Sequence, residues 1–280
     1  MPELPEVETV CRGLAKVLLG ERIEEVKQHR PDLRAPLPRN LPSRLKGKQV
    51  VSIHRRAKYI LIELDNGEVL LVHLGMSGRF VISHHDRKPA EKHDHLVFYF
   101  THDIVVRFND PRRFGLCDLI AKKDLEKHKL MRHLGIEPLG KKLTRAFLQE
   151  KLKGKKSSLK AALMDQRLIA GLGNIYVCEA LFYAGISPRR RAGNCKAAEL
   201  AKLVLAIRKV LSAAIKAGGS SLRDYVQANG ELGYFQNHFA VYGREGKFCP
   251  ACICKANGSK GLRRIIQQGR SSFYCPTKQV

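Results

Sequence analysis

The spacing of apolar residues changes twice along this chain of 280 residues, close to residues 50 and 120. Between these points, short apolar runs bounded by turn residues follow the two-residue period of strands. These runs predict strands at Lys58–Leu64, Glu68–Leu74, Gly78–Ile82, His95–Phe100, Ile104–Phe108 and Leu116–Ile120. Between the first two runs, the sequence Asp65-Asn66-Gly67 predicts a tight hairpin. We therefore expect a mostly antiparallel sandwich or barrel in this half of the chain.

Helical spacing dominates the rest of the chain. At the N-terminus, the apolar positions from Val7 to Leu18 keep this spacing until Gly20 ends the run. Further helices are predicted over Lys123–His133, Leu143–Lys151, Ser158–Asp165, Asn174–Ala184, Ala197–Ala217 and Ser221–Ala228. The fold class is thus α+β, with an N-terminal antiparallel β-sandwich that carries a helix and a C-terminal helical part. We place the domain ranges at 1–134, 135–155 (a linker and the start of the helical domain), 156–236 and 237–280.

The C-terminal segment needs a staple, because from about Val241 it has too few apolar residues to fold unaided. It holds four of the eight cysteines: Cys249, Cys252, Cys254 and Cys275. Such crowding indicates a metal site first and a disulfide framework only as a distant second. The other cysteines are scattered and are typical of small core residues in a reducing cytosol.

Two Cys-x-x-Cys pairs that flank a basic hairpin would indicate tetrahedral zinc. The second pair is incomplete here, since Lys278 stands where a fourth thiolate is expected, and an ammonium group is no ligand at neutral pH. Three arrangements stay open: zinc held by Cys249, Cys252, Cys254 and Cys275, zinc held by three thiolates and an outside ligand, or a metal-free finger held by apolar packing. We favour one structural zinc ion.

The charge balance is far from ordinary. The chain has 51 Lys and Arg residues against 26 Asp and Glu, a formal net charge of +25. This excess indicates a polyanionic partner, most often nucleic acid and less often an anionic membrane surface, with a merely soluble surface as the ordinary alternative. No run of about 18 apolar residues and no signal-peptide pattern is present, so we expect a cytoplasmic protein without membrane association.

The first residues have two interpretations. Pro2 after Met1 suits removal of the initiator, and the freed prolyl amine would titrate near about pH 8, so that a useful fraction is a neutral nucleophile. Glu3 can move a proton, and Glu6 is a second carboxylate within one helical turn. Alternatively, Pro5 merely starts a helix whose first turn favours acids.

Three internal motifs also have two interpretations each. Lys58, in Arg-Arg-Ala-Lys-Tyr, is either a solvated charge at a strand end or a group that holds a phosphate or donates a proton. The turn from Asp110 to Gly115 is either a surface β-turn with Phe114 folded inward or a cationic wedge of the type that distorts a duplex. Gly171-Leu-Gly-Asn-Ile can bind a phosphate at a helix N-terminus, but it lacks the spacing of a dinucleotide fingerprint or a P-loop.

Taken together, these motifs resemble one family. They occur in order as Pro-Glu-Leu-Pro-Glu-Val-Glu, Arg-Arg-Ala-Lys-Tyr, His-Leu-Gly-Met-Ser-Gly, Lys-His-Asp-His, Asp-Pro-Arg-Arg-Phe-Gly, Gly-Leu-Gly-Asn-Ile-Tyr, Val-Tyr-Gly-Arg-Glu-Gly and Gly-Arg-Ser-Ser-Phe-Tyr-Cys-Pro. Over essentially the whole chain, the sequence resembles formamidopyrimidine-DNA glycosylases, bacterial enzymes that excise oxidised purines. Its Pro-Glu-Leu-Pro-Glu start favours this branch over the related endonuclease VIII branch.

The resemblance implies an N-terminal β-sandwich, a helix–two-turn–helix domain and a zinc-finger hairpin, with double-stranded damaged DNA in the cleft between the parts. It implies that Pro2 forms a Schiff base with C1′ of the damaged nucleotide and that Glu3 acts as general acid and base. Lys58 would assist β-elimination and Arg270 would support δ-elimination. We expect a monomer without a redox or nucleotide cofactor.

The resemblance also assigns contact residues. Void-filling residues that replace the flipped nucleotide would be Met76, Arg112 and Phe114. DNA-contacting positions would be Glu6, His73, His93, Arg112, Lys156 and Asn174. The loop Gly218–Gln236, with Gly230, Gly233 and Tyr234, lies where the family contacts the lesion. Two other interpretations remain: a catalytically silent DNA- or RNA-binding protein with a degenerate finger, and a sibling glycosylase with a different base preference.

Overall fold

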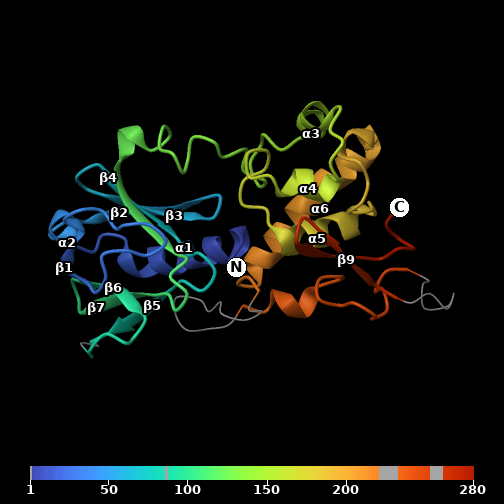
Figure 1. The fold of residues 1–280 in the computed structure, drawn as a ribbon. Helices are drawn as coiled ribbons and strands as arrows, with labels where there is room; N and C mark the ends of the chain where they lie inside the picture. The colour runs from blue at the N-terminus through green and yellow to red at the C-terminus, as the bar shows by residue number, and fades with distance from the viewer. Residues whose placement is uncertain (1, 86–87, 221–232, 253–260) are drawn as a thin grey trace. The chain divides into compact units, whose positions relative to one another are not determined.

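The computed structural model of the protein describes residues 2–85, 88–220, 233–252 and 261–280 (Figure 1). The chain divides into two compact units. The first unit comprises Met1–Arg132 with Ala217–Gln236, and the second comprises His133–Lys216 with Asn237–Val280. The segment Ala217–Gln236 therefore groups with the N-terminal unit, although its place in the sequence predicts that it belongs to the helical domain 156–236.

Two antiparallel sheets and one long helix build most of the first unit. One sheet has the order β2 (Val50–Arg56), β3 (Tyr59–Leu64), β4 (Glu68–His73) and β8 (Leu116–Ala121). The other has the order β1 (Ile23–Gln28), β6 (Asp94–Phe100), β7 (Ile104–Asn109) and β5 (Arg79–His84). Helix α1 (Leu4–Leu18) lies against β2 and β3, and the short helix α2 (Leu41–Leu45) lies against β1. The predicted antiparallel sandwich with an N-terminal helix is confirmed.

The core of this unit follows from the apolar periods of its elements. One face of α1 buries Val7, Val10, Leu14 and Leu18 among alternate residues of both sheets, such as Ile60 and Phe98. The predicted hairpin joins β3 to β4: the Gly67 N–H donates to the Leu64 carbonyl at 3.0 Å, and Gly67 has a φ of 79°. A positive φ suits glycine, which explains the Asn-Gly turn.

The predicted helix over Lys123–His133 is wrong. The structure has a 3₁₀ turn at Lys122–Asp124, followed by further turns. The apolar residues of this segment are Leu125, Leu130 and Met131, of which Met131 alone is buried. A helix with so little apolar surface to bury, and with many like charges, gains too little from packing to form.

Helices dominate the second unit. They are α3 (Arg145–Leu152), α4 (Leu159–Met164), α5 (Asn174–Ala184) and α6 (Ala197–Lys216). The N-caps of α3 and α4 are Thr144 and Ser158, whose hydroxyls accept backbone N–H groups. Strands β9 (Arg263–Gln267) and β10 (Arg270–Tyr274) form the expected C-terminal hairpin. The helix predicted over Ser221–Ala228 lies outside the described residues.

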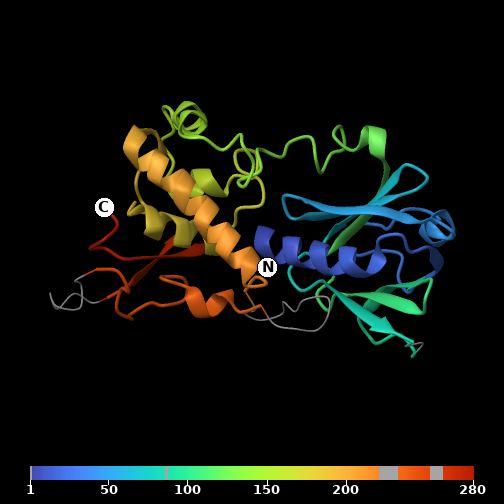
Figure 2. The same ribbon diagram turned by 180° about the vertical axis from the view of Figure 1, so that it is seen from behind.

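Helix α5 is the centre of the second unit. It packs against α4, α6 and β10, and nearly all of its side chains are buried, which explains why it is apolar on every face. Figure 2 shows α6 along its length on the side opposite to the hairpin of the same unit. Among the described helices, none combines the length and the apolar character that a membrane span requires.

Candidate functional site

The start of α1 is buried and held by a carboxylate. Pro2 and Glu3 directly precede the helix, and both are buried. The Glu3 N–H donates to Glu6 Oε2 at 2.8 Å. The other oxygen, Glu6 Oε1, accepts the Ser220 N–H at 2.8 Å and the Ser220 hydroxyl at 3.0 Å. Glu6 thus joins two segments that are 214 residues apart in sequence and fixes the backbone that follows Pro2.

Lys58 lies in the tight turn between β2 and β3, where it is 8% exposed. The preceding residue, Ala57, has a φ of 54°. Arg55 ties this turn to α1, because its guanidinium donates to the Ala57 carbonyl at 3.0 Å and to Glu8 Oε2 at 3.0 Å. Lys58 is therefore buried in a turn that Arg55 fixes rather than free in solvent, which favours a functional role over a solvated charge.

His73, at the end of β4, is a neutral imidazole at physiological pH. Burial, together with the positive charges of Lys58 and Arg34, lowers the pKa of His73 to about 4. The Gly75 N–H donates to its Nδ1 at 3.0 Å. A neutral ring that accepts at Nδ1 carries its proton on Nε2. His73 can therefore donate one hydrogen bond without adding a charge.

The turn between β7 and β8 is organised by Asp110, which is fully buried. Its carboxylate accepts the Ser77 hydroxyl at 2.6 Å and the Gly115 N–H at 2.7 Å. Between these anchors, the Arg112 guanidinium lies 5.0 Å from the centre of the Phe114 ring. Phe114 is 43% exposed. The alternative in which Phe114 folds inward is therefore wrong, and the turn presents an aromatic ring and a cation at the surface.

Met76 and His93 lie on segments that contact this turn. A Cβ added to Gly75 would come within 2.3 Å of the Phe114 carbonyl carbon, so the backbone before Met76 touches the backbone of Phe114. The Asp110 N–H donates to the His93 carbonyl at 3.0 Å. The structure therefore brings together the loops of the three residues expected to fill a void, and it places His93 beside them.

In the second unit, Asn174 is the first residue of α5 and contacts the hairpin. Its Nδ2 donates to the Ser271 carbonyl at 3.0 Å and to the Tyr242 hydroxyl at 3.4 Å. Arg270 begins β10 directly before Ser271 and is exposed, as is Lys156 ahead of α4. Of the two predicted DNA-contacting residues of this unit, Lys156 is therefore a surface group, whereas Asn174 is half-buried at the start of α5.

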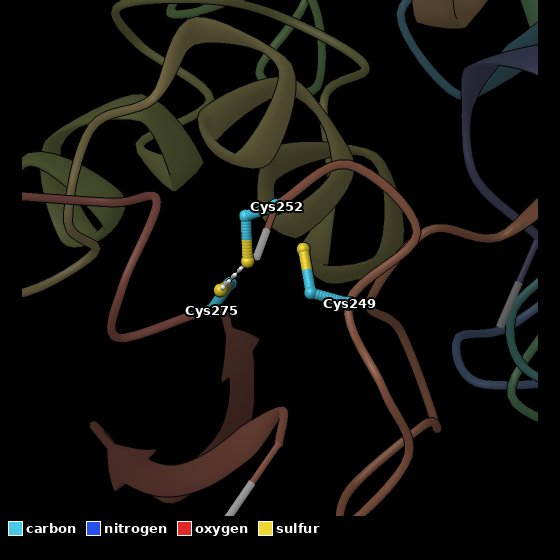
Figure 3. A group of neighbouring side chains, drawn as sticks. All are labelled: Cys249, Cys252 and Cys275. Atoms are coloured by element: carbon cyan, nitrogen blue, oxygen red, sulfur yellow. Dashed lines mark hydrogen bonds between the residues drawn. The ribbon is translucent and has the colours of Figure 1, made fainter. Parts of the chain in front are cut away.

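Three cysteines of the C-terminal segment form a cluster (Figure 3). The sulfur atoms of Cys249, Cys252 and Cys275 all lie within 4.8 Å of one another, and those of Cys252 and Cys275 are 3.5 Å apart. Around tetrahedral zinc, thiolates at about 2.3 Å from the metal are about 3.8 Å apart, so this donor set fits a metal ion. Cys254, the fourth candidate, lies outside the described residues.

Lys278 does not direct its ammonium group at these sulfurs. Its Nζ lies 4.3 Å from the centre of the Phe182 ring, a cation–π distance. Its backbone N–H donates to Cys275 Sγ at 3.4 Å. Burial raises the pKa of Cys249 to about 12, so the thiol ionises only with a cation beside it. The three cysteines can hold a metal ion, and Lys278 supports one of them through its backbone.

Several organising residues were not predicted from the sequence. They are Ser220, Asp110, Lys160 and Glu179. The fully buried Glu179 accepts the N–H groups of Ala240, Val241 and Tyr242 at 2.9–3.0 Å. A charged residue within an otherwise apolar helix, such as Glu179 in α5, is the one signal that could have revealed such a role.

The folds of the two units, the buried start of α1 and the cysteine-bearing hairpin define a DNA glycosylase of the helix–two-turn–helix class. The model of the formamidopyrimidine-DNA glycosylase N-terminal domain matches residues 1–117, and that of the formamidopyrimidine-DNA glycosylase H2TH domain matches residues 134–226. A formamidopyrimidine-DNA glycosylase of Dinoroseobacter shibae is 53% identical over 100% of both chains. The chain belongs to the formamidopyrimidine-DNA glycosylase family.

Solved structures support the same assignment. A complex of a Lactococcus lactis Fpg variant with DNA containing Fapy-dG has a TM-score of 0.89 and 35% identity, covering 99% of both chains. The MutM (Fpg) protein of Thermus thermophilus has a TM-score of 0.86 and 38% identity, covering 99% of this chain and 98% of that one. The expected family, fold class and enzyme class are confirmed.

Proposed function

We propose that the protein excises formamidopyrimidines and 8-oxoguanine from double-stranded DNA and then cleaves the abasic strand through a Schiff base on Pro2. The observation that carries this proposal is the start of α1, where Pro2 and Glu3 are buried and the Glu6 carboxylate fixes the Glu3 backbone. A nucleophile held in one position reacts faster than a mobile one, because its orientation is fixed before the reaction.

In the proposed reaction, removal of Met1 leaves Pro2 with a secondary amine, whose lone pair attacks C1′ of the damaged nucleotide. The bond from C1′ to the base breaks, and the base leaves with a proton. Glu3 transfers protons as the sugar ring opens to an iminium ion. The cationic nitrogen acidifies the 2′-hydrogen, so loss of that proton expels the 3′ phosphate. Lys58 assists this β-elimination as a proton donor, and Arg270 supports δ-elimination of the second phosphate.

DNA contacts are proposed for the surface groups of both units. Met76, Arg112 and Phe114 would fill the void left by the extruded nucleotide, and the exposed Phe114 ring with the Arg112 cation suits that task. His73, His93, Lys156 and Asn174 would contact the nucleic acid, whereas the buried Glu6 would act through the backbone of Glu3 and Ser220 that it fixes. Base extrusion costs a few kcal/mol, and the inserted side chains and phosphate contacts offset that cost.

We also propose one structural zinc ion, held by Cys249, Cys252 and Cys275. The spacing of their sulfurs fits thiolate ligands, and a metal in this position would join Cys249 and Cys252 to Cys275, which directly follows β10. When bound, zinc would cross-link the two ends of the finger. Cys254 remains a candidate fourth ligand.

Borohydride trapping on a duplex with 8-oxoguanine tests the proposed activity. Borohydride reduces the iminium to a stable amine, so protein shown to lack Met1 should form a covalent adduct with the DNA. The adduct should be lost in Pro2→Gly and in protein with a blocked N-terminus. Pro5→Ala is the matched control, since it removes a proline of the helix start but leaves the nucleophile, and it should trap normally.

The alternative function, a silent nucleic-acid-binding protein, predicts the opposite result. Such a protein would bind the duplex in a gel-shift assay but would give no adduct with any variant. Binding without trapping, in protein shown to lack Met1, would therefore reject the glycosylase mechanism and leave the binding function.

A further inference from the structure

Lys160 is a buried cation that the proposed reaction does not use. It lies on α4 and is only 1% exposed. Its Nζ donates to the Ser271 carbonyl at 3.1 Å and to the Ser272 hydroxyl at 2.6 Å. Both acceptors belong to β10, in the two positions directly after Arg270. The ammonium group thus ties α4 to the start of the strand that carries Arg270.

The hydrogen bonds continue from Lys160 across the hairpin. The Ser272 hydroxyl donates to Gln267 Oε1 at 2.7 Å, and Gln267 Nε2 donates to the Pro188 carbonyl at 3.1 Å. Ser272 is fully buried, so these bonds are shielded from competing water. Strands β9 and β10 are therefore both attached to the body of the second unit through one connected set of bonds.

Asn174 adds a second donor to the same carbonyl. Its Nδ2 donates to the Ser271 carbonyl at 3.0 Å. The opposite orientation of the amide is unfavourable, because it would place the Asn174 oxygen against the carbonyl oxygen of Ser271. The Ser271 carbonyl therefore accepts from both Lys160 and Asn174. One of these residues is buried in α4 and the other begins α5, so two helices fix a single peptide group of β10.

The register of the hairpin explains why this peptide matters. Arg270 pairs directly with Gln267, and the turn between them consists of Gln268 and Gly269, with φ values of 49° and 69°. Two residues with positive φ form a tight hairpin turn. Because Gln267 and Ser271 are both fixed, the backbone of Arg270 is fixed on both sides, while its side chain stays exposed.

The cost of burying an ammonium group indicates that Lys160 positions β10 rather than stabilises the fold. A buried ammonium loses its hydration, and an apolar side chain of similar size often gives equal or greater stability. What an apolar side chain cannot supply is a pair of directed hydrogen bonds to β10. We propose that Lys160 is a positioning residue that holds Arg270 for the δ-elimination step, an inference that rests on the role proposed for Arg270.

The test compares the two elimination steps on DNA with an abasic site. In Lys160→Met, δ-elimination should slow by about 10- to 100-fold, the effect expected of a displaced catalytic group, so that the β-elimination product accumulates. Formation of the borohydride adduct should keep the wild-type rate, because Pro2 is not affected. Arg270→Ala should show the same product ratio as Lys160→Met, and the double variant should slow δ-elimination no further than Arg270→Ala alone.

A structural role would give a different result. If Lys160 only stabilised the fold, Lys160→Met would slow adduct formation and both eliminations together, and its effect would add to that of Arg270→Ala. Either outcome would overturn the proposal. A wild-type product ratio in folded Lys160→Met would also overturn it. If Lys160→Met does not fold, Ser272→Ala carries the test, since it breaks the connection to Gln267 and should shift the products in the same direction. Absence of the adduct in the wild-type protein would instead reject the proposed function.

Discussion

Three buried carboxylates organise the backbone around the candidate functional residues. Glu6 binds the N–H groups of Glu3 and Ser220, Asp110 binds that of Gly115, and Glu179 binds three consecutive N–H groups beginning at Ala240. Burial raises the pKa of the Glu179 carboxyl, although the three N–H groups oppose this effect. A buried acid satisfied by backbone donors fixes a loop without occupying its surface, which leaves side chains such as Phe114 exposed for binding.

The chemistry of these residues was predictable, but their partners were not. Pro2, Glu3 and Lys58 stand in motifs whose residue types suggest a nucleophile and proton donors. The bond between Glu6 and Ser220 spans 214 residues, and the bond between Lys160 and Ser272 spans 112. Local patterns carry no information about pairs so far apart, so these contacts emerge only from the fold.

At the residue scale, His73 should make the protein sensitive to acid. Its pKa falls from about 6.5 in the unfolded chain to about 4 in the fold. Between these values the unfolded state binds a proton that the folded state does not, so stability is full above about pH 6.5 and is lost as the pH falls toward 4. From pH 7.5 to 5 the loss due to His73 should be about 2 kcal/mol, as measured by urea unfolding.

His73→Asn should remove most of this loss, because its amide oxygen can accept the Gly75 N–H but does not titrate. His102→Asn is the control with the opposite sign. Hydrogen bonding to Glu21 raises the pKa of His102, so this residue favours the fold at low pH and its removal should not lessen the acid loss. An unchanged pH dependence in His73→Asn would contradict the assignment of a neutral, buried imidazole.

At the element scale, prediction succeeded where the apolar pattern is clear, either as a run between turns or as one apolar face. The sheet strands β3, β4 and β7 alternate or run apolar between clear turns, and α1 has one apolar face. Strand β1 was missed because its sequence, Ile-Glu-Glu-Val-Lys-Gln, buries only two of its residues and has no strand period. The segment Lys123–His133 failed for the opposite reason, since helix-forming residues alone do not supply a packed face.

The cluster of Cys249, Cys252 and Cys275 gives a testable prediction about metal binding. If three thiolates hold zinc, Lys278→Cys should supply a fourth and tighten binding, because the Lys278 N–H already contacts Cys275 Sγ and places this position beside the cluster. Zinc content and its release to a chelator measure the effect. Wild-type protein should lose zinc at lower chelator concentrations than Lys278→Cys, and Cys275→Ser should lose it most readily.

Controls separate the metal from the cation–π contact. Lys278→Met removes the charge over Phe182 without adding a ligand, and it should leave zinc release unchanged. Equal release from the wild-type protein and Lys278→Cys would show that another residue already completes the site, with Cys254→Ser as the direct test. Wild-type protein that is purified with no zinc would show that the finger is metal-free.

At the scale of the whole molecule, the net charge and the pattern of apolar residues predict different properties of the protein. The net charge of +25 indicates a polyanionic partner but gives no fold, whereas the apolar periods predict domains only as continuous ranges of the chain. Residues Ala217–Gln236 illustrate the difference, since they follow α6 in sequence yet group with the first unit, where Ser220 binds Glu6. Long-range pairing of this kind determines which unit a segment joins.

The charge predicts a strong dependence of DNA binding on salt. Each phosphate that the protein neutralises contributes about −0.9 to the slope of log Kobs against log salt concentration, because binding releases condensed counterions. Lys156 is exposed, and if it contacts a phosphate, Lys156→Ala should reduce the magnitude of the slope by about 1 and weaken binding to damaged and undamaged duplexes alike. Fluorescence anisotropy at several salt concentrations measures both quantities.

Phe114→Ala is the matched comparison, because Phe114 is exposed but carries no charge. It should leave the salt slope unchanged and weaken binding to the damaged duplex alone, since a void exists only where a nucleotide has left the stack. Equal salt slopes for the wild-type protein and Lys156→Ala would remove Lys156 from the phosphate contacts. A salt slope near zero for the wild-type protein would contradict the larger claim, because the excess of 51 cationic over 26 anionic side chains would then have no part in binding DNA.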